Sequence, residues 1–131
     1  MKPLFAVPSW VIPGTYAENL RFLDSKREID TVELLFFIYD PEVRSLLDRE
    51  YDLIRSYGSR FTFTAHLPDP LLPEHEELVD RLEPLVRHFI VHPGKPETMD
   101  RTMLLVDSWE RKFAVKGSAT LNVNGLPMHA T

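Results

Sequence analysis

The sequence predicts an α/β domain built on a parallel sheet. Short runs of β-type residues alternate with longer helical patterns along the 131 residues, and this alternation is typical of consecutive βα units. Polar residues of the strands recur at similar intervals, because Glu33 to His66 spans 33 positions, His66 to His92 spans 26 and His92 to Asn122 spans 30. Each interval has the length of one βα unit, so we expect about four complete units and a fifth strand.

The first unit is expected to contain a strand at residues 4–7 and a helix that begins near Thr15. Thr15 and Glu18 have the spacing of a capping box, in which each side chain bonds the free backbone N–H of the other residue. The next strand is predicted at residues 31–38. This run is nearly continuous in apolar residues and includes a single acid, Glu33, which predicts a strand buried on both faces.

The second helix is predicted to open at Asp40 and Pro41, with the aspartate as N-cap and the proline in the first turn. Gly58 is expected to end it in a left-handed conformation. The third strand, residues 61–66, alternates strictly. One face therefore carries apolar side chains and the other carries Thr62, Thr64 and His66.

The remaining elements follow the same alternation. A helix is expected over residues 74–86, where Pro84 should kink or end it. A strand at 89–92 is followed by a helix at about 97–112 and a short strand at 119–123. We expect residues 1–131 to form one domain, in which residues 113–131 are an atypical tail because no acidic residue follows Glu110.

Composition excludes several classes of protein. The chain has no cysteine, so disulfide frameworks and thiolate metal sites are excluded. Fifteen basic residues against twenty acidic ones give a net charge of −5, which disfavours nucleic acid as a partner. No apolar run approaches the length of a membrane span, so we expect no membrane association and a cytoplasmic location.

The order of the strand-end motifs resembles a known family. The sequence lacks the glycine-rich first turn of nucleotide-binding folds, whereas several strands carry a polar residue near the end that feeds the next helix. The motifs Val32-Glu33-Leu34, Thr64-Ala65-His66-Leu67-Pro68 and Val91-His92-Pro93-Gly94 resemble the xylose-isomerase-like TIM-barrel superfamily over about residues 4–112. The resemblance implies the (β/α) units of a TIM barrel, present here as a partial barrel.

The resemblance also implies chemistry at the mouth of that barrel. Family members are metal-dependent sugar or sugar-phosphate isomerases and epimerases, or relatives of apurinic endonucleases. Carried over by position, His66 and His92 would line a substrate site and bind a divalent metal such as Zn, Mn or Mg, with Glu33 as a catalytic acid or base. Trp10, which follows the first strand, is a candidate wall of the substrate pocket.

A non-catalytic function is the alternative. Where the family carries a metal-binding glutamate on strand five, this chain has Asn122, and an amide is a poorer ligand for a hard cation. Strands six to eight are absent from the sequence, so the first and fifth strands would be open edges. The alternative is therefore a half-barrel that forms a homo-oligomer, most simply a homodimer, or binds a small polyol or metal without turnover.

Several of these residues are also compatible with a purely structural role. His66 and His92 are compatible with local hydrogen bonding at strand ends, and Glu33 is compatible with a role as an anchor for a neighbouring strand or loop. His75 lies in a helix start rich in glutamate and is expected to be solvated. His88 has the strand parity of His92 but is expected at the other end of the barrel.

Overall fold

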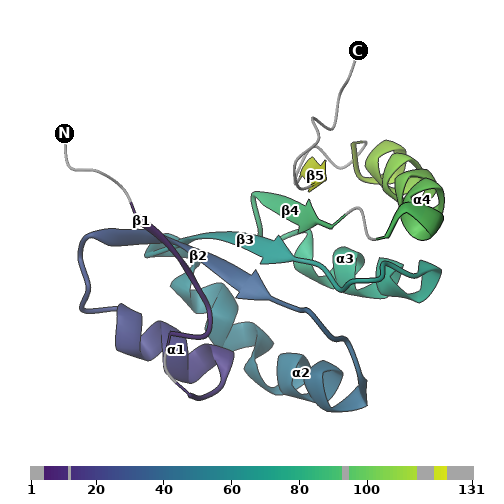
Figure 1. Cartoon of the computed structure of the whole chain (residues 1–131). Helices are drawn as coiled ribbons and strands as arrows, with labels where there is room; N and C mark the ends of the chain where they lie inside the picture. The colour runs from purple at the N-terminus through teal and green to yellow at the C-terminus, as the bar shows by residue number, and fades with distance from the viewer. Residues whose placement is uncertain (1–4, 12, 93–94, 115–119, 124–131) are drawn as a thin grey trace.

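A computed structural model describes residues 5–11, 13–92, 95–114 and 120–123 (Figure 1). The strands are β1 (Phe5–Pro8), β2 (Ile29–Leu35), β3 (Thr62–His66), β4 (His88–Val91) and β5 (Thr120–Val123). The α-helices are α1 (Tyr16–Leu23), α2 (Pro41–Ser56), α3 (Glu76–Leu82) and α4 (Pro96–Ala114). Two 3-10 turns, η1 (Tyr57–Ser59) and η2 (Pro73–His75), follow α2 and precede α3.

The five strands form one sheet in the order β1-β2-β3-β4-β5, and every neighbouring pair is parallel. This arrangement confirms the prediction of an α/β fold with a parallel sheet. Because the strands lie in the sheet in the same order as in the chain, each βα crossover leads to the next strand in the same direction. Because such crossovers are right-handed, consecutive helices pack on the same side of the sheet, as α1 and α2 do in Figure 1.

The local signals at the helix starts are confirmed. The Thr15 backbone N–H donates to Glu18 Oε1 at 2.9 Å, and the Glu18 N–H donates to Thr15 Oγ1 at 3.2 Å. At the start of α2, the Val43 N–H donates to Asp40 Oδ1 at 2.8 Å. Helix α3 ends two residues before Pro84, as the missing N–H of proline requires.

The predicted left-handed end of α2 at Gly58 is wrong. In the described part of the chain, Gly14 alone has a positive φ. Helix α2 instead tightens into η1, and the N–H groups of Arg60 and Phe61 both donate to the Tyr57 carbonyl at 2.9 Å. Those bonds satisfy the end of the helix without a left-handed residue.

The prediction that residues 31–38 are buried on both faces is also wrong. Val32, Leu34 and Phe36 are fully buried on the face toward the helices, but Glu33 and Leu35 on the opposite face are half-buried. In the part of the chain that the structure describes, the helices pack on one face of this sheet, so alternate residues of β2 meet different surroundings. We call the other side the open face, and it carries the polar side chains of the strands.

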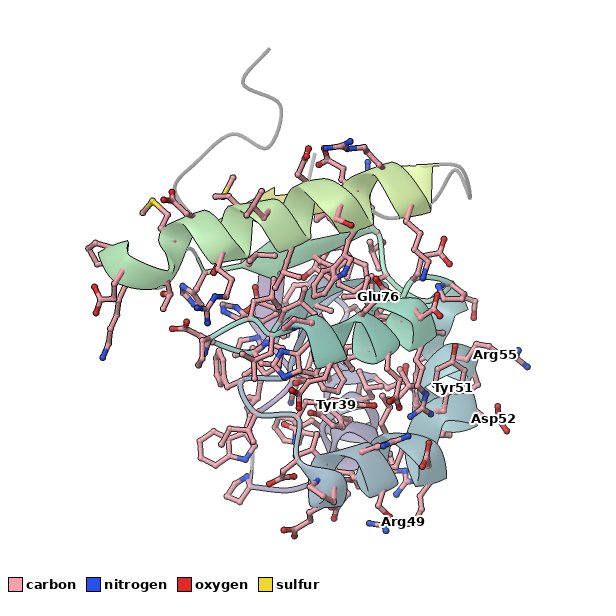
Figure 2. The ribbon with its side chains drawn as sticks, turned by 90° about the vertical axis from the view of Figure 1, so that its right-hand side faces the viewer. Tyr39, Arg49, Tyr51, Asp52, Arg55 and Glu76 are labelled. Carbon is pink, nitrogen blue, oxygen red and sulfur yellow. The ribbon has the colours of Figure 1, made fainter. Side chains whose placement is uncertain are left out.

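The helical layer is held together by side chains that reach from helix to helix. The Tyr51 hydroxyl of α2 donates to the Arg81 carbonyl of α3 at 2.8 Å, and Lys112 Nζ of α4 lies 2.8 Å from Glu76 Oε2 of α3. Figure 2 shows Tyr51 turned toward α3, whereas Arg49 and Arg55 of α2 point away from the core. These contacts fix the helices behind the strands that carry the site.

Candidate functional site

Polar side chains of β2, β3 and β4 lie in lateral rows on the open face. Glu33 is in register with Thr64, and Thr64 is in register with His88. The next row toward the carboxyl ends joins Leu35, His66 and Ile90. Because all strands are parallel, their carboxyl ends share one edge of the sheet, which is where parallel α/β folds place their ligands.

His66 lies at the centre of this edge. It is the last residue of β3, and its ring contacts the ring of His92, which directly follows β4, with 4.4 Å between the centroids and 44° between the planes. Glu33 Oε2 of β2 lies 3.7 Å from His66 Nδ1. The Phe37 ring meets the His66 ring edge-on with 4.8 Å between centroids. The structure therefore brings together three of the four predicted site residues.

The two ring nitrogens of His66 have no hydrogen-bond partner. His66 is only 7% exposed, and both Nδ1 and Nε2 are buried without a donor or acceptor in hydrogen-bond range. The 3.7 Å separation from Glu33 is too long for a hydrogen bond. Buried polar groups are nearly always bonded, and one that is not costs free energy. An unpartnered buried imidazole is therefore the feature of this edge that most needs a functional explanation.

Burial lowers the pKa of His66 below its usual value of 6.5, and the neighbouring His92 lowers it further. The carboxylates of Glu33 and Asp69 act in the opposite direction and raise this pKa, but they do not reverse the shift. His66 is therefore neutral at pH 7. A neutral imidazole has one N–H donor and one acceptor nitrogen, so it is able to accept a proton from a ligand or to bond a hydroxyl group.

The donor set for a metal is incomplete in the part of the chain that the structure describes. His66 and His92 provide two imidazoles, whereas catalytic zinc sites normally have three protein ligands. No three His, Asp or Glu side chains within residues 5–11, 13–92, 95–114 and 120–123 are grouped so that they would hold an ion. The Zn, Mn or Mg implied by the resemblance stays a prediction.

Trp10 lies in a neighbouring pocket rather than against His66. This pocket has a volume of about 270 Å³ and is lined by Trp10, Tyr16, Leu46 and the β2 end at Leu35 and Phe37. Phe37 is shared, because the same ring also contacts His66. Of the other residues singled out in the sequence, Asn122 is placed opposite Ile90 in β5, and Pro93 and Gly94 lie outside the described residues.

Phe37 and Asp69 belong to the site although the strand-end pattern did not single them out as site residues. Phe37 has the parity of Glu33 and Leu35, so extending the alternation past the strand end would have found it. Asp69 follows β3 by three residues and acts electrostatically on His66. The sequence feature that could have identified Asp69 is its position in the loop that follows a strand ending in histidine.

The expectation that His75 is solvated is wrong. His75 is only 6% exposed, and its Nδ1 accepts a hydrogen bond from the Leu72 backbone N–H at 3.0 Å. Burial lowers the pKa of His75, and Glu74 opposes that shift. This side chain holds the turn η2 together, which explains a buried histidine among acidic neighbours. His88 begins β4 on the open face, at the opposite end from His92.

Fold and site together define an α/β protein with a histidine and carboxylate pair at the carboxyl edge of a parallel sheet. The sequence matches no protein-family model, and comparisons with curated proteins and with solved structures found no similar chain. Within the described ranges, no helix has both the length and the apolar character needed to cross a membrane.

The lowered pKa values of His66 and His75 predict a loss of stability in mild acid. Below about pH 6.5 the unfolded chain binds a proton at each histidine that the folded chain does not, so the free energy of unfolding falls as pH falls. The free energy of unfolding stops falling once the pH is below the pKa that each histidine has in the folded chain. Its slope is at most about 1.4 kcal/mol per pH unit for each histidine. We expect urea denaturation of the His66→Phe variant to show a smaller loss between pH 7.5 and 5.5 than the unsubstituted chain. Equal losses would contradict the assignment to His66.

Proposed function

We propose that this chain is a xylose-isomerase-like domain of partial TIM-barrel type that binds a small sugar or sugar phosphate at the carboxyl edge of β2, β3 and β4. The strand order supports this proposal, because a singly wound parallel sheet is the topology of a (β/α) barrel and a doubly wound sheet reverses direction. The carboxyl edge supports it because Glu33, His66 and His92 gather there, where such barrels bind ligands.

The observation that carries the proposal is the unpartnered imidazole of His66. A sugar hydroxyl or carbonyl next to His66 would supply the missing hydrogen bonds. Sugars offer several donors and acceptors on adjacent carbons, so one molecule would reach Nδ1 or Nε2 of His66 together with the Glu33 carboxylate. The unsatisfied group in the free protein thus becomes a satisfied one in the complex.

The same pair supports proton transfer next to a carbonyl group. Neutral His66 would accept the proton of a carbon adjacent to the sugar carbonyl. The electron pair of that C–H bond would form a carbon–carbon double bond, and the π pair of the carbonyl group would move to its oxygen to give an enediolate. The imidazolium that forms would lie 3.7 Å from Glu33 Oε2, whose negative charge stabilises it. Return of the proton from the imidazolium to the neighbouring carbon, together with transfer of the adjacent hydroxyl proton to the enediolate oxygen, completes an isomerisation.

Replacing His66 by phenylalanine is expected to separate binding from stability. The substitution keeps an aromatic ring against Phe37 and His92 and removes two unsatisfied nitrogens, so it should raise the free energy of unfolding at pH 7.5 by about 1–2 kcal/mol. Calorimetric titration with D-xylose, xylitol and D-ribose 5-phosphate should show binding of at least one of them to the unsubstituted chain and at least about tenfold weaker binding to the variant.

His88→Phe is the matched control, because His88 lies on the same face at the far end of β4 and should leave binding unchanged. Transfer of deuterium from solvent into the bound sugar, followed by NMR, tests the catalytic step and should be lost in His66→Phe and in Glu33→Gln. Binding without deuterium transfer would favour the non-catalytic alternative. Equal binding by the His66 and His88 variants, or no binding by the unsubstituted chain, would contradict the proposal.

A further inference from the structure

The pocket beside the site is a half-open hollow at the ends of the first two strands. It lies between the loop that follows β1, the end of β2 and the first half of α2, and its volume is about 270 Å³. We call it the aromatic pocket, after Trp10, Tyr16 and Phe37, which line it together with Leu35 and Leu46.

Hydrogen bonds within the protein hold the walls of the aromatic pocket in place. The Tyr16 hydroxyl donates to the Leu35 carbonyl at 2.7 Å, and the Leu35 N–H donates to Ser9 Oγ at 3.0 Å. The β1 loop is tied down further on, where the Val11 N–H donates to Oδ1 of the buried Asn19 at 2.7 Å. The cavity is therefore formed before a ligand arrives, as small-molecule sites usually are.

The polar groups around the aromatic pocket already serve the fold, so the wall that remains for a ligand is mainly carbon. Trp10 is 64% exposed and Phe37 is 53% exposed, which is high for aromatic side chains of this size. Large apolar groups left at the surface in one place commonly mark a binding site. A planar apolar ring would cover these aromatic surfaces and remove them from water.

The volume of the pocket limits the size of the ring system that it would hold. A cavity of about 150 Å³ accommodates benzene. A volume of about 270 Å³ therefore has room for a ring system of two fused aromatic rings. The pocket adjoins His66, because two residues of its lining are neighbours of that side chain: the Phe37 ring contacts the His66 ring, and Leu35 is the register partner of His66 in the sheet.

We propose that the aromatic pocket binds the planar apolar ring of the same small ligand whose polar part reaches His66. The ligand class is then an aryl-substituted polyol, with a polyhydroxylated part over Glu33 and His66 and a one- or two-ring apolar part between Trp10, Phe37 and Leu46. This inference rests on the proposed function for the position of the polar part, whereas the pocket itself is argued from its own walls.

Three probes test the two halves separately: 2-naphthol for the aromatic pocket, D-xylose for the polar edge, and 2-naphthyl β-D-xylopyranoside for both. Calorimetric titration of the full chain is expected to show that the naphthyl xyloside binds at least about tenfold more tightly than either part. Leu46→Phe fills the pocket and should reduce xyloside affinity to that of xylose. His66→Phe should reduce it to that of 2-naphthol.

Matched variants separate a filled pocket from a damaged fold. Leu53→Phe places the same side chain on the same helix, two turns after Leu46 and outside the pocket, and should leave 2-naphthol binding unchanged. Ile38→Ala removes an exposed apolar side chain next to Phe37 and should also leave it unchanged, whereas Phe37→Ala should weaken it at least about fivefold.

Distinct outcomes would overturn the inference and the proposed function. If xylose binds in a His66-dependent way but 2-naphthol does not bind, or binds equally to Leu46→Phe, the aromatic pocket is not a ring site. If 2-naphthol binds in a Leu46-dependent way but the xyloside binds no better, the ring site stands and its link to His66 fails. Acrylamide quenching of Trp10 that changes with protein concentration and not with 2-naphthol would overturn the inference, because it would assign these aromatic groups to an interface between two copies.

Discussion

Replacing Phe36 by alanine is expected to lower the free energy of unfolding by about 4 kcal/mol, whereas the same substitution of the adjacent Phe37 should change it by less than about 1 kcal/mol. Phe36 is fully buried and stacks on Tyr16 with 5.0 Å between ring centroids, so its removal opens a cavity in the core. Phe37 lies on the open face and is half exposed. Urea denaturation at pH 7.5 measures both values.

This pair tests which side of β2 the helices cover. A loss of about 4 kcal/mol is a large part of the stability of a domain of this size, so Phe36→Ala should also lower the thermal midpoint clearly. Similar large losses for both variants would mean that the open face is covered in solution, for example by a second copy of the chain. A small loss for Phe36→Ala would contradict the position of the core.

Arg60→Ala is expected to cost about 3 kcal/mol of unfolding free energy, although the residue lies outside every predicted element. The guanidinium group closes the connection between α1 and β2, where it donates to the carbonyls of Ile29 at 2.7 Å, Lys26 at 2.9 Å and Asp24 at 3.2 Å. The same group lies over the Phe61 ring at 4.2 Å from its centroid. Charge-assisted bonds of this kind contribute about 1.5–3 kcal/mol each, and they are not additive.

Two variants separate this role from that of an ordinary surface charge. Arg60→Lys keeps the charge but loses the planar fork that reaches several carbonyls at once, so it should recover less than half of the lost stability. Arg49→Ala removes an exposed arginine of α2 that donates to the Ser45 hydroxyl, and it should cost less than about 1 kcal/mol. Equal costs for Arg49→Ala and Arg60→Ala would contradict the role of Arg60.

The position of the candidate site follows largely from the sequence. Alternation in residues 61–66 put His66 on the polar face of its strand, and the interval to His92 put both histidines at the ends of adjacent parallel strands. The structure places their rings in contact, as that reasoning implies. Their roles toward a metal or a sugar stay predictions, as do the partial TIM barrel and the association of two copies.

The sequence was a poorer guide where burial depends on which layers are present. A run of apolar residues looks the same whether helices cover one face of its strand or both, so the pattern at 31–38 did not by itself decide that Glu33 and Leu35 lie on a half-buried face. His75 was misjudged for a related reason. Its neighbours in sequence are acidic, but its partner in space is the backbone N–H of Leu72.

By itself, therefore, the sequence determined the helix starts, the order of βα units and the edge at which the histidines meet, because capping boxes, periodicity and strand direction are local properties. Only the tertiary structure decided that Arg60 joins α1 to β2 and that both nitrogens of His66 are buried without a hydrogen-bond partner. These features depend on how groups distant in sequence share space and exclude water, which no single stretch of the chain specifies.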